Sequence, residues 1–355
     1  MKLVTVEVQT LLGPFARLGA MVGDDILDLN AAYTYWLTEQ GDTVPETVAA
    51  TLMPPDMLRF LSIGNRGLET ARTLTQLHLH GEFHHNRGPQ GQRLWYTPDD
   101  IAQGRVTLCA PLRNPGSLRD CLSFETHVEN GAKKRGEAIP EPWFEMPVYY
   151  KGNPKTIIGP NAVVPWPHYT KKLDYELEWA CVIGKAGQDI PQTQARNHIA
   201  GFMIFNDFSA RDIQAKEMKC RLGPAKGKDF ASAFGPWLVT PDELPADRNL
   251  TMRATVNGEV WSEGTTGSAY WPFEALVAHA SRGEMLYPGD IIGSGTVGFG
   301  CGFETLKWIQ PGDVVTLEIE GLGALTNTVG QPETPPAHGL TANYESPNRP
   351  QPVQA

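Results

Sequence analysis

The stretch DYELEWACVIG at residues 174–184 joins two closely spaced glutamates to an unbroken apolar run that ends at a glycine. Such a run is typical of a buried β-strand. Residues i and i+2 of a strand share a face, so the carboxylates of Glu176 and Glu178 should project side by side, about 7 Å apart at the backbone. Two like charges repel unless they face water or a cation lies between them. The pair therefore indicates either a solvated strand face or a metal site.

A third carboxylate follows in GFMIFNDFSARDIQ, residues 201–214. The run GFMIF resembles a buried strand that ends by delivering Asp207 at the edge of a core. The alternative is that Asp207 caps the next helix and that Arg211 pairs locally. Three carboxylates suit a hard cation, so Glu176, Glu178 and Asp207 are candidate ligands of Mg²⁺, with Mn²⁺ or Ca²⁺ as alternatives.

The organisation of the whole chain predicts a mostly β protein with a few helices, in the α+β class. Residues 1–104 should form a small N-terminal domain and linker, with short strands to about residue 30 and helices over 31–80. Residues 105–330 should form a catalytic domain of many short strands. Its better helix candidates are RNHIAGFMIFND (196–207) and WPFEALVAHASR (271–282). Residues 331–355 read as a Pro-rich tail.

Bulk properties limit the partners that this chain can have. It has 355 residues and a formal net charge of −10, which argues against a nucleic-acid partner because that would need a basic face. No apolar run approaches a membrane span, and the N-terminus does not resemble a signal peptide. Five scattered cysteines without CxxC spacing indicate reduced thiols. A soluble cytoplasmic protein that acts on a small molecule is expected.

Three further segments carry residues that could do chemistry. The loop GPAKGKDF (223–230) offers Lys228 for a substrate carboxylate or an oxyanion, although it could equally be a surface lysine. The glycine-dense GSGTVGFGCG (293–302) lets backbone N–H groups and Thr296 approach an anion, or is simply a wide turn. LRDCLSFETHVENG (118–131) carries Asp120 and His127. Histidine is the usual general base near neutral pH, but a lone histidine at a helix start is more often structural.

Taken in order, these motifs resemble the fumarylacetoacetate hydrolase family over roughly residues 105–330. The motifs are YYKGNPKTIIGP, DYELEWACVIG, GFMIFNDFSARDIQ, GPAKGKDF followed by FGPWLVT, NGE, YPGDIIGSGTVG and LKWIQPGDVV. The resemblance implies a mixed β-roll with a small N-terminal domain, usually built as a homodimer. It implies metal binding by Glu176, Glu178 and Asp207, with Asp120 joining the set. It also implies substrate-site roles for the following residues: Tyr150, Arg211, Gln214, Lys228 and Thr296.

The resemblance also suggests which reaction is catalysed. Fumarylacetoacetase has an Asp seven residues before a catalytic His that is followed by x-x-Asn, which matches Asp120, His127 and Asn130. Family decarboxylases and acylpyruvases have Glu at the last of these positions. Glu304 is the nearest match to the glutamate that orients the histidine. Met218 falls where fumarylacetoacetase has a second substrate tyrosine, so the substrate should differ from fumarylacetoacetate in size or polarity.

The expected function is therefore a divalent-metal-dependent hydrolase that cleaves a C–C bond of a small β-diketo acid, as in aromatic catabolism. Fumarylacetoacetate, fumarylpyruvate and acylpyruvates are the candidate substrate types. The alternatives are decarboxylation, hydration or tautomerisation of a 2-oxo acid on the same fold. A non-catalytic binding protein is a third alternative, but it should have lost a metal ligand or the base, and all of these residues are present.

Overall fold

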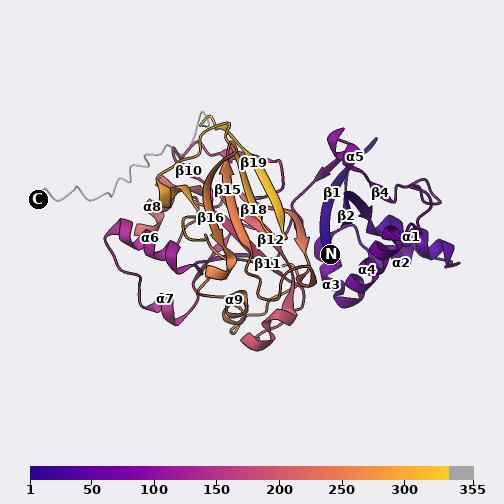
Figure 1. The fold of residues 1–355 in the computed structure, drawn as a ribbon, viewed down its shortest axis with the longest axis horizontal. Helices are drawn as coiled ribbons and strands as arrows, with labels where there is room; N and C mark the ends of the chain where they lie inside the picture. The colour runs from indigo at the N-terminus through magenta and orange to yellow at the C-terminus, as the bar shows by residue number, and fades with distance from the viewer. Residues whose placement is uncertain (336–355) are drawn as a thin grey trace, which may run out of the picture.

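The structure is a computed structural model that describes residues 1–335. Figure 1 shows the N-terminal segment to one side of a larger β-rich body. The predicted tail begins at the end of strand β19 (Gly323–Pro332), and the rest of it, from residue 336, lies outside the described residues. Whether the chain divides at residues 104 and 330 stays a prediction.

The N-terminal segment combines a small antiparallel sheet with a group of helices. Three strands follow one another, paired in order: β1 (Lys2–Thr10), β2 (Gly13–Val22) and β3 (Asp25–Asp28). The helices are α1 (Leu29–Glu39), α2 (Pro45–Leu52), α3 (Met57–Ile63) and α4 (Asn65–Leu79). The short elements β4 (Trp95–Tyr96) and α5 (Pro98–Ala102) complete this part. The predicted β unit followed by helices is thus observed.

A long mixed sheet runs through both parts of the chain, because β1 pairs with β14 (Ser232–Val239). From β14 the order continues through β12 (Ile199–Asp207), β11 (Leu177–Ile183), β17 (Ile291–Gly293), β6 (Leu118–Cys121) and β7 (Tyr149–Gly152). β5 (Val106–Leu108) pairs with β1, and β8 (Ile157–Ile158) pairs with β14. The sheet therefore places β6, β11 and β12, which carry the candidate metal ligands, close to one another.

A second, five-stranded sheet packs against the long one. Its order is β16 (Glu259–Thr265), β15 (Thr251–Val256), β18 (Val314–Ile319), β19 and β9 (Val163–Trp166). A two-stranded pair, β10 (Leu173–Asp174) and β13 (Ser209–Ala210), forms a third, separate sheet. One hydrophobic cluster draws residues from both large sheets, among them Phe202 and Leu317. Burial of the two facing surfaces therefore forms the core of the roll.

The helices of the β-rich part are short. They are α6 (Glu125–Arg135), α7 (Pro142–Glu145), α8 (Arg211–Lys219), α9 (Phe273–Ala280) and α10 (Gly302–Thr305). Three 3₁₀ turns accompany them: η1 (Gln192–His198), η2 (Pro241–Glu243) and η3 (Thr266–Ser268). The helix expected within 271–282 is α9.

The helix predicted for residues 196–207 is wrong, because only a 3₁₀ turn to His198 and then strand β12 occupy this stretch. Every residue of β12 is buried, with β11 on one side and β14 on the other. A strand covered on both faces has no polar–apolar alternation, so its apolar run resembles that of a buried helix. The other reading, a buried strand that ends at Asp207, is what the structure contains.

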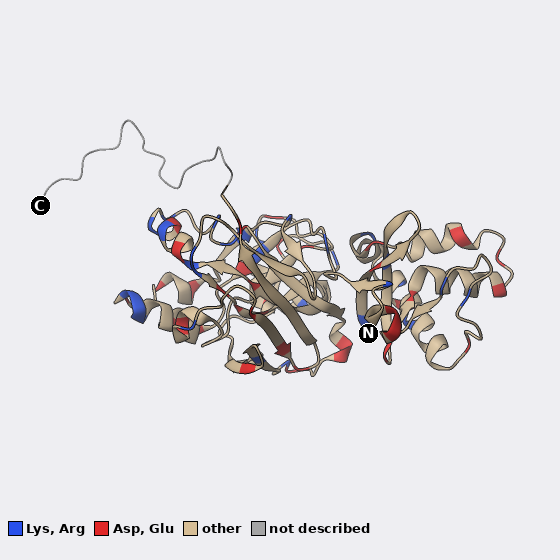
Figure 2. Cartoon of the chain, turned by 90° about the horizontal axis from the view of Figure 1, so that it is seen from above, with Lys and Arg blue, Asp and Glu red and all other residues tan. Residues whose placement is uncertain are grey.

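The predicted fold class, strand-rich α+β of this family's type, is confirmed. Figure 2 shows Lys and Arg residues interspersed with Asp and Glu residues on both parts of the chain. Within residues 1–335, no helix is both long and apolar enough to cross a membrane.

Candidate active site

Four carboxylates from three neighbouring strand segments meet in the β-rich part. One oxygen from each lies within 4.8 Å of the others, and all four residues are buried: Asp120, Glu176, Glu178 and Asp207. Asp120 lies on β6, Glu178 on β11 and Asp207 at the end of β12, while Glu176 immediately precedes β11. The strand order brings these segments together, and the two-residue spacing keeps both glutamates on one face.

The glycine-rich loop after β17 holds two of these carboxylates. The N–H of Gly295 donates to Glu178 Oε2 at 3.0 Å and to Asp120 Oδ1 at 3.2 Å. Thr296 Oγ1 donates to Glu178 Oε1 at 3.1 Å. Gly295 has φ of +79°, and a Cβ there would lie 2.2 Å from the carbonyl oxygen of Cys121. Only glycine allows the backbone N–H to reach these two carboxylates.

Lys228 and Tyr150 contact the other side of the cluster. The Lys228 ammonium donates to both Glu176 and Asp207. The Tyr150 hydroxyl donates to Asp207 Oδ2 at 2.7 Å. The second oxygen of Asp207, Oδ1, is buried and has no hydrogen-bond partner. A buried, unpaired carboxylate oxygen costs free energy, and this atom is available to ligate a cation.

Arg211 orients Glu176 rather than pointing freely into the site. Its guanidinium donates to Asp174 at 2.7 Å, to Glu176 at 2.8 Å and to Gln214 at 2.9 Å. Asp174 was not among the predicted site residues. It also accepts from the backbone N–H of Gly302 and Phe303, and so anchors α10. Its sequence signal was its position as the first residue of the DYELE motif.

Burial and mutual repulsion shift the pKa values of these carboxyls. Burial first, and then the Asp207 charge, hold the pKa of Asp120 well above its usual value. Burial and the Asp120 charge do the same for the pKa of Glu178, and burial and Glu176 raise the pKa of Asp207. Burial also opposes ionisation of Glu176, but Arg211, Lys228 and His127 outweigh it and lower the pKa of Glu176.

These residues fit a divalent cation. When all are ionised, five buried carboxylates, including Asp174, together pair within residues 1–335 with two cationic side chains, Lys228 and Arg211, which leaves an excess of three negative charges. A divalent cation would offset most of this excess and supply a partner for Asp207 Oδ1. The ligand set contains only carboxylate oxygens, which Mg²⁺, Mn²⁺ and Ca²⁺ prefer.

His127 and Glu304 form a hydrogen-bonded dyad next to this cluster. His127 Nδ1 lies 2.9 Å from Glu304 Oε2. The other oxygen of Glu304 accepts from Asn130 Nδ2 at 2.8 Å and from the Phe299 N–H at 3.0 Å. Burial would raise the pKa of Glu304, but hydrogen bonds and charge from His127 lower it overall, with help from Asn130. The carboxylate therefore stays ionised and holds the ring in one orientation.

The structure brings all the predicted site residues into these two adjoining groups. An isolated β-bridge between Glu176 and Cys301, whose thiol donates to Glu304 Oε2 at 3.4 Å, joins the dyad to the cluster. The residues predicted to bind substrate contact the predicted metal ligands: Tyr150 contacts Asp207, Thr296 contacts Glu178, and Arg211 contacts Glu176. Their catalytic and binding roles stay predictions.

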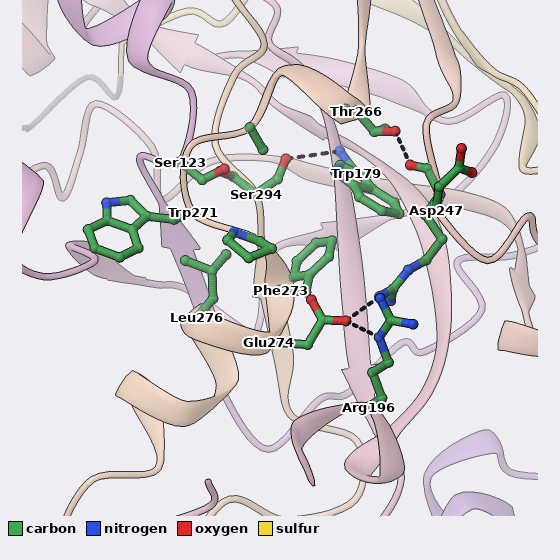
Figure 3. A pocket seen from close by; sticks show the side chains of 14 residues that line it. Ser123, Trp179, Arg196, Asp247, Thr266, Trp271, Phe273, Glu274, Leu276 and Ser294 are labelled. Carbon is green, nitrogen blue, oxygen red and sulfur yellow. Dashed lines mark hydrogen bonds and ion pairs between the residues drawn. The ribbon is translucent and has the colours of Figure 1, made fainter. Parts of the chain in front are cut away.

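A separate cavity of about 170 Å³ lies on the opposite face of β11. Figure 3 shows Trp179 and Phe273 facing it, with Glu274 pairing with Arg196. Because neighbouring residues of a strand face opposite ways, Trp179 points into this cavity while Glu178 points into the cluster. Ser294, immediately before Gly295, also lines it. The cavity thus borders the loop that holds Glu178 but does not contain the carboxylate cluster.

Comparison with known proteins places this site in a family. The family described as "Fumarylacetoacetate (FAA) hydrolase C-terminal" matches residues 118–330. A mitochondrial oxaloacetate tautomerase of Xenopus laevis is 29% identical over 327 residues, which cover 91% of this chain and 89% of the relative.

Two solved structures share the fold over nearly their full lengths. The 5-carboxymethyl-2-hydroxymuconate delta-isomerase of Mycobacterium smegmatis has a TM-score of 0.61 and 24% identity, covering 94% of this chain and 100% of its own. The maleylpyruvate hydrolase of Sphingobium sp. SYK-6 has a TM-score of 0.65 and 20% identity, with the same coverage. The family match extends from the strand that carries Asp120 to the end of the sheet, and the chain therefore belongs to the fumarylacetoacetate hydrolase family.

Proposed function

We propose that this protein is a divalent-metal-dependent hydrolase that cleaves a C–C bond of a small β-diketo acid. The observation that carries the proposal is the His127–Glu304 dyad, with its 2.9 Å contact, beside a buried cluster of four carboxylates. Hydrolysis needs a base that activates water as well as a site that stabilises developing negative charge. The two adjoining groups could supply both.

Asp120, Glu176, Glu178 and Asp207 would hold the cation, with Mg²⁺ expected and Mn²⁺ or Ca²⁺ as alternatives. When bound, such a cation polarises the oxygens of a chelated β-diketo or 2-oxo acid and stabilises the enolate that cleavage releases. Gly295 and Thr296 would orient Glu178 for this task, and Arg211 would orient Glu176.

His127 is the proposed base. Because the ionised Glu304 accepts the Nδ1 proton, the lone pair of Nε2 is free to accept a proton from water. The resulting hydroxide adds to the carbonyl carbon, and Lys228 with Gln214 would stabilise the oxyanion. The C–C bond then breaks, its electron pair forms the enolate, and His127 returns the proton to the enolate carbon. Water and a β-diketo acid thus give a carboxylic acid and a methyl ketone.

The known relatives support this class of substrate. One solved structure of the shared fold is a maleylpyruvate hydrolase in complex with a manganese(II) ion and pyruvate. Pyruvate is a 2-oxo acid, the part of an acylpyruvate that would chelate a cation in the proposed reaction. The charge excess of the carboxylate cluster is the feature of this chain that supports a metal in the same role.

A second candidate is the keto–enol tautomerisation of a 2-oxo acid. It is favoured by the Xenopus laevis relative, an oxaloacetate tautomerase that aligns over most of both chains. The same dyad could move a proton between the carbon and the oxygen of a 2-oxo acid, with no bond to carbon broken except C–H. The two candidates differ in whether water is consumed and two products form.

One absorbance screen tests both candidates. Purified protein with Mg²⁺, Mn²⁺ or Ca²⁺ is given acylpyruvates, fumarylpyruvate, fumarylacetoacetate and the enol form of oxaloacetate, and loss of the enol band is followed. Product analysis then separates the reactions, since hydrolysis yields two acids and tautomerisation yields the ketone alone. Band loss without cleavage of any diketone would overturn the hydrolase proposal in favour of the tautomerase.

We also propose that two copies of the chain associate, as the family resemblance implies. Light scattering coupled to size-exclusion chromatography tests this, and a mass equal to one chain at micromolar concentration would contradict it.

A further inference from the structure

Cys301 lies beside the dyad and has no role in the proposed reaction. Its thiol donates to Glu304 Oε2 at 3.4 Å, the same oxygen that faces His127 Nδ1. One ligand atom from each of these three residues lies within 4.8 Å of the others. An imidazole, a thiol and a carboxylate thus converge on one small volume.

This donor set differs in kind from the carboxylate cluster. Zn²⁺ and Co²⁺ favour nitrogen and sulfur ligands, whereas Mg²⁺ and Ca²⁺ favour oxygen alone. Bond lengths of about 2.0–2.3 Å in a tetrahedral zinc site place neighbouring ligand atoms roughly 3.3–3.8 Å apart. The Sγ–Oε2 distance of 3.4 Å already lies in this range, and the Nδ1–Oε2 distance of 2.9 Å must lengthen slightly to reach it.

We propose that His127, Cys301 and Glu304 form an inhibitory site for a thiophilic divalent cation such as Zn²⁺, separate from the four-carboxylate site. The carboxylate ligand is held in place, because Asn130 and the Phe299 N–H occupy Oε1 and leave Oε2 facing the other two residues. Thiolate and carboxylate together balance the charge of the cation. The His127 side chain is 14% exposed, whereas that of Glu304 is fully buried, so the cation enters past His127.

Binding blocks the base by fixing its tautomer; this step rests on the proposed role of His127. Cys301 releases its thiol proton to solvent, and the cation takes the Nδ1 lone pair of a neutral imidazole. The single ring proton then resides on Nε2, the nitrogen that would otherwise accept a proton from water. Coordination therefore inhibits even when the carboxylate cluster is fully loaded.

The test uses the full chain saturated with Mg²⁺ and adds Co²⁺ or Zn²⁺. Thiolate coordination to Co²⁺ gives a charge-transfer absorption in the near ultraviolet that an all-oxygen site lacks, so this signal does not depend on activity. Cys301→Ser keeps a hydrogen-bond donor to Glu304 and removes the soft ligand. Cys220→Ser, at an exposed cysteine on the C-terminal side of α8, is the matched control.

The wild type and Cys220→Ser should show the absorption and should be inhibited by Zn²⁺ in a way that excess Mg²⁺ does not relieve. Cys301→Ser should lose the absorption, and its Zn²⁺ concentration for half-inhibition should rise by more than about 100-fold, beyond the range for loss of an outer-shell partner. An absorption that persists in Cys301→Ser, or inhibition that Mg²⁺ relieves equally in both proteins, overturns the proposal. Absorption and Zn²⁺ binding without inhibition would leave the metal site in place but would overturn its inhibitory role, and would argue against His127 as the base of the proposed function.

Discussion

Glu304 Oε2 and His127 Nδ1 lie 2.9 Å apart although 177 positions separate the two residues in the chain. The contact joins α10 to α6, and Asn130, one turn after His127, secures the other oxygen of the same carboxylate. This arrangement fixes the ring orientation of the proposed base before any substrate binds.

His127→Gln should reduce diketone cleavage by about 10²–10⁴-fold, the usual cost of losing a general base. Metal affinity should remain near that of the wild type, because His127 is not among the four clustered carboxylates. Loss of the enol band measures the first effect, and calorimetric titration with Mn²⁺ measures the second. His80→Gln, at an exposed histidine of the N-terminal part, is the control. Full diketone cleavage by His127→Gln would refute the assignment.

Glu304→Gln should cause a smaller loss of activity than His127→Gln. The amide oxygen of the substituted side chain can still accept from Nδ1, but the negative charge that stabilises the protonated ring is gone. The lowered pKa of Glu304 also means that this carboxylate does not titrate in the neutral range. Comparing kcat for the two variants at one pH checks the order, and equal or larger losses in Glu304→Gln would contradict a purely orienting role.

Glu178→Gln and Asp207→Asn should each abolish tight binding of the divalent metal. Each substitution replaces a charged oxygen in a cluster whose four ligand atoms lie within 4.8 Å of one another. Asp100→Asn is the control, since Asp100 is a buried carboxylate of α5 that pairs with Arg93 and Arg105 and is not a member of this cluster. Equilibrium dialysis with Mn²⁺ measures the number of bound ions. Undiminished binding in both cluster variants would place the metal elsewhere.

The stability of the metal-free protein should fall as pH rises from about 5 to about 8. The pKa values of Asp120, Glu178 and Asp207 are raised in the folded state, so the native protein binds more protons than the unfolded chain in this window. The free energy of unfolding then decreases with pH. The lowered pKa of Glu176 acts below this window, where its stabilising contribution is lost on acidification.

Thermal unfolding in a chelator, followed at several pH values, measures this dependence. Added Mg²⁺ should raise Tm most at the upper end, because the cation takes the place of bound protons. Glu178→Gln should flatten the pH dependence of the metal-free Tm. A metal-free Tm that increases with pH across the whole pH range would show that other groups offset the repulsion among these carboxylates.

Gly295→Ala should destabilise the protein and weaken metal binding together. A side chain there is strained at φ of +79°, which costs about 1–3 kcal/mol, and its Cβ would also meet the Cys121 carbonyl at 2.2 Å. Any shift moves the N–H that holds Glu178 and Asp120. Gly283→Ala is the matched control, with φ of +65° and no atom within 4 Å. Gly295→Ala should lower the free energy of unfolding, measured with denaturant, and the metal affinity, measured by titration, more than Gly283→Ala does. Equal effects in the two variants would contradict the proposal that the Gly295 N–H positions Glu178 and Asp120.

The sequence by itself determined the local geometry of the proposed metal ligands. Alternation along a strand is a property of the backbone, so the two-residue spacing of Glu176 and Glu178 was sufficient to place both carboxylates on one face. The end of an apolar run likewise located Asp207. The ordered motifs indicated the family and its fold. The match over residues 118–330 confirms the family, and the strand-rich α+β structure confirms the fold class.

Only the tertiary structure decided which distant residues meet. Residues 199–207 are buried throughout, so their unbroken apolar pattern fits a buried strand and a buried helix equally well. Their pairing with β11 and β14 in the structure shows that they form a strand. Asp174 and Cys301 were not recognised as neighbours of the site, because their partners Arg211 and Glu304 are positioned by other elements. Hydrogen bonds between distant side chains form only after whole helices and strands have packed together. The local pattern of apolar and polar residues does not contain information about that packing.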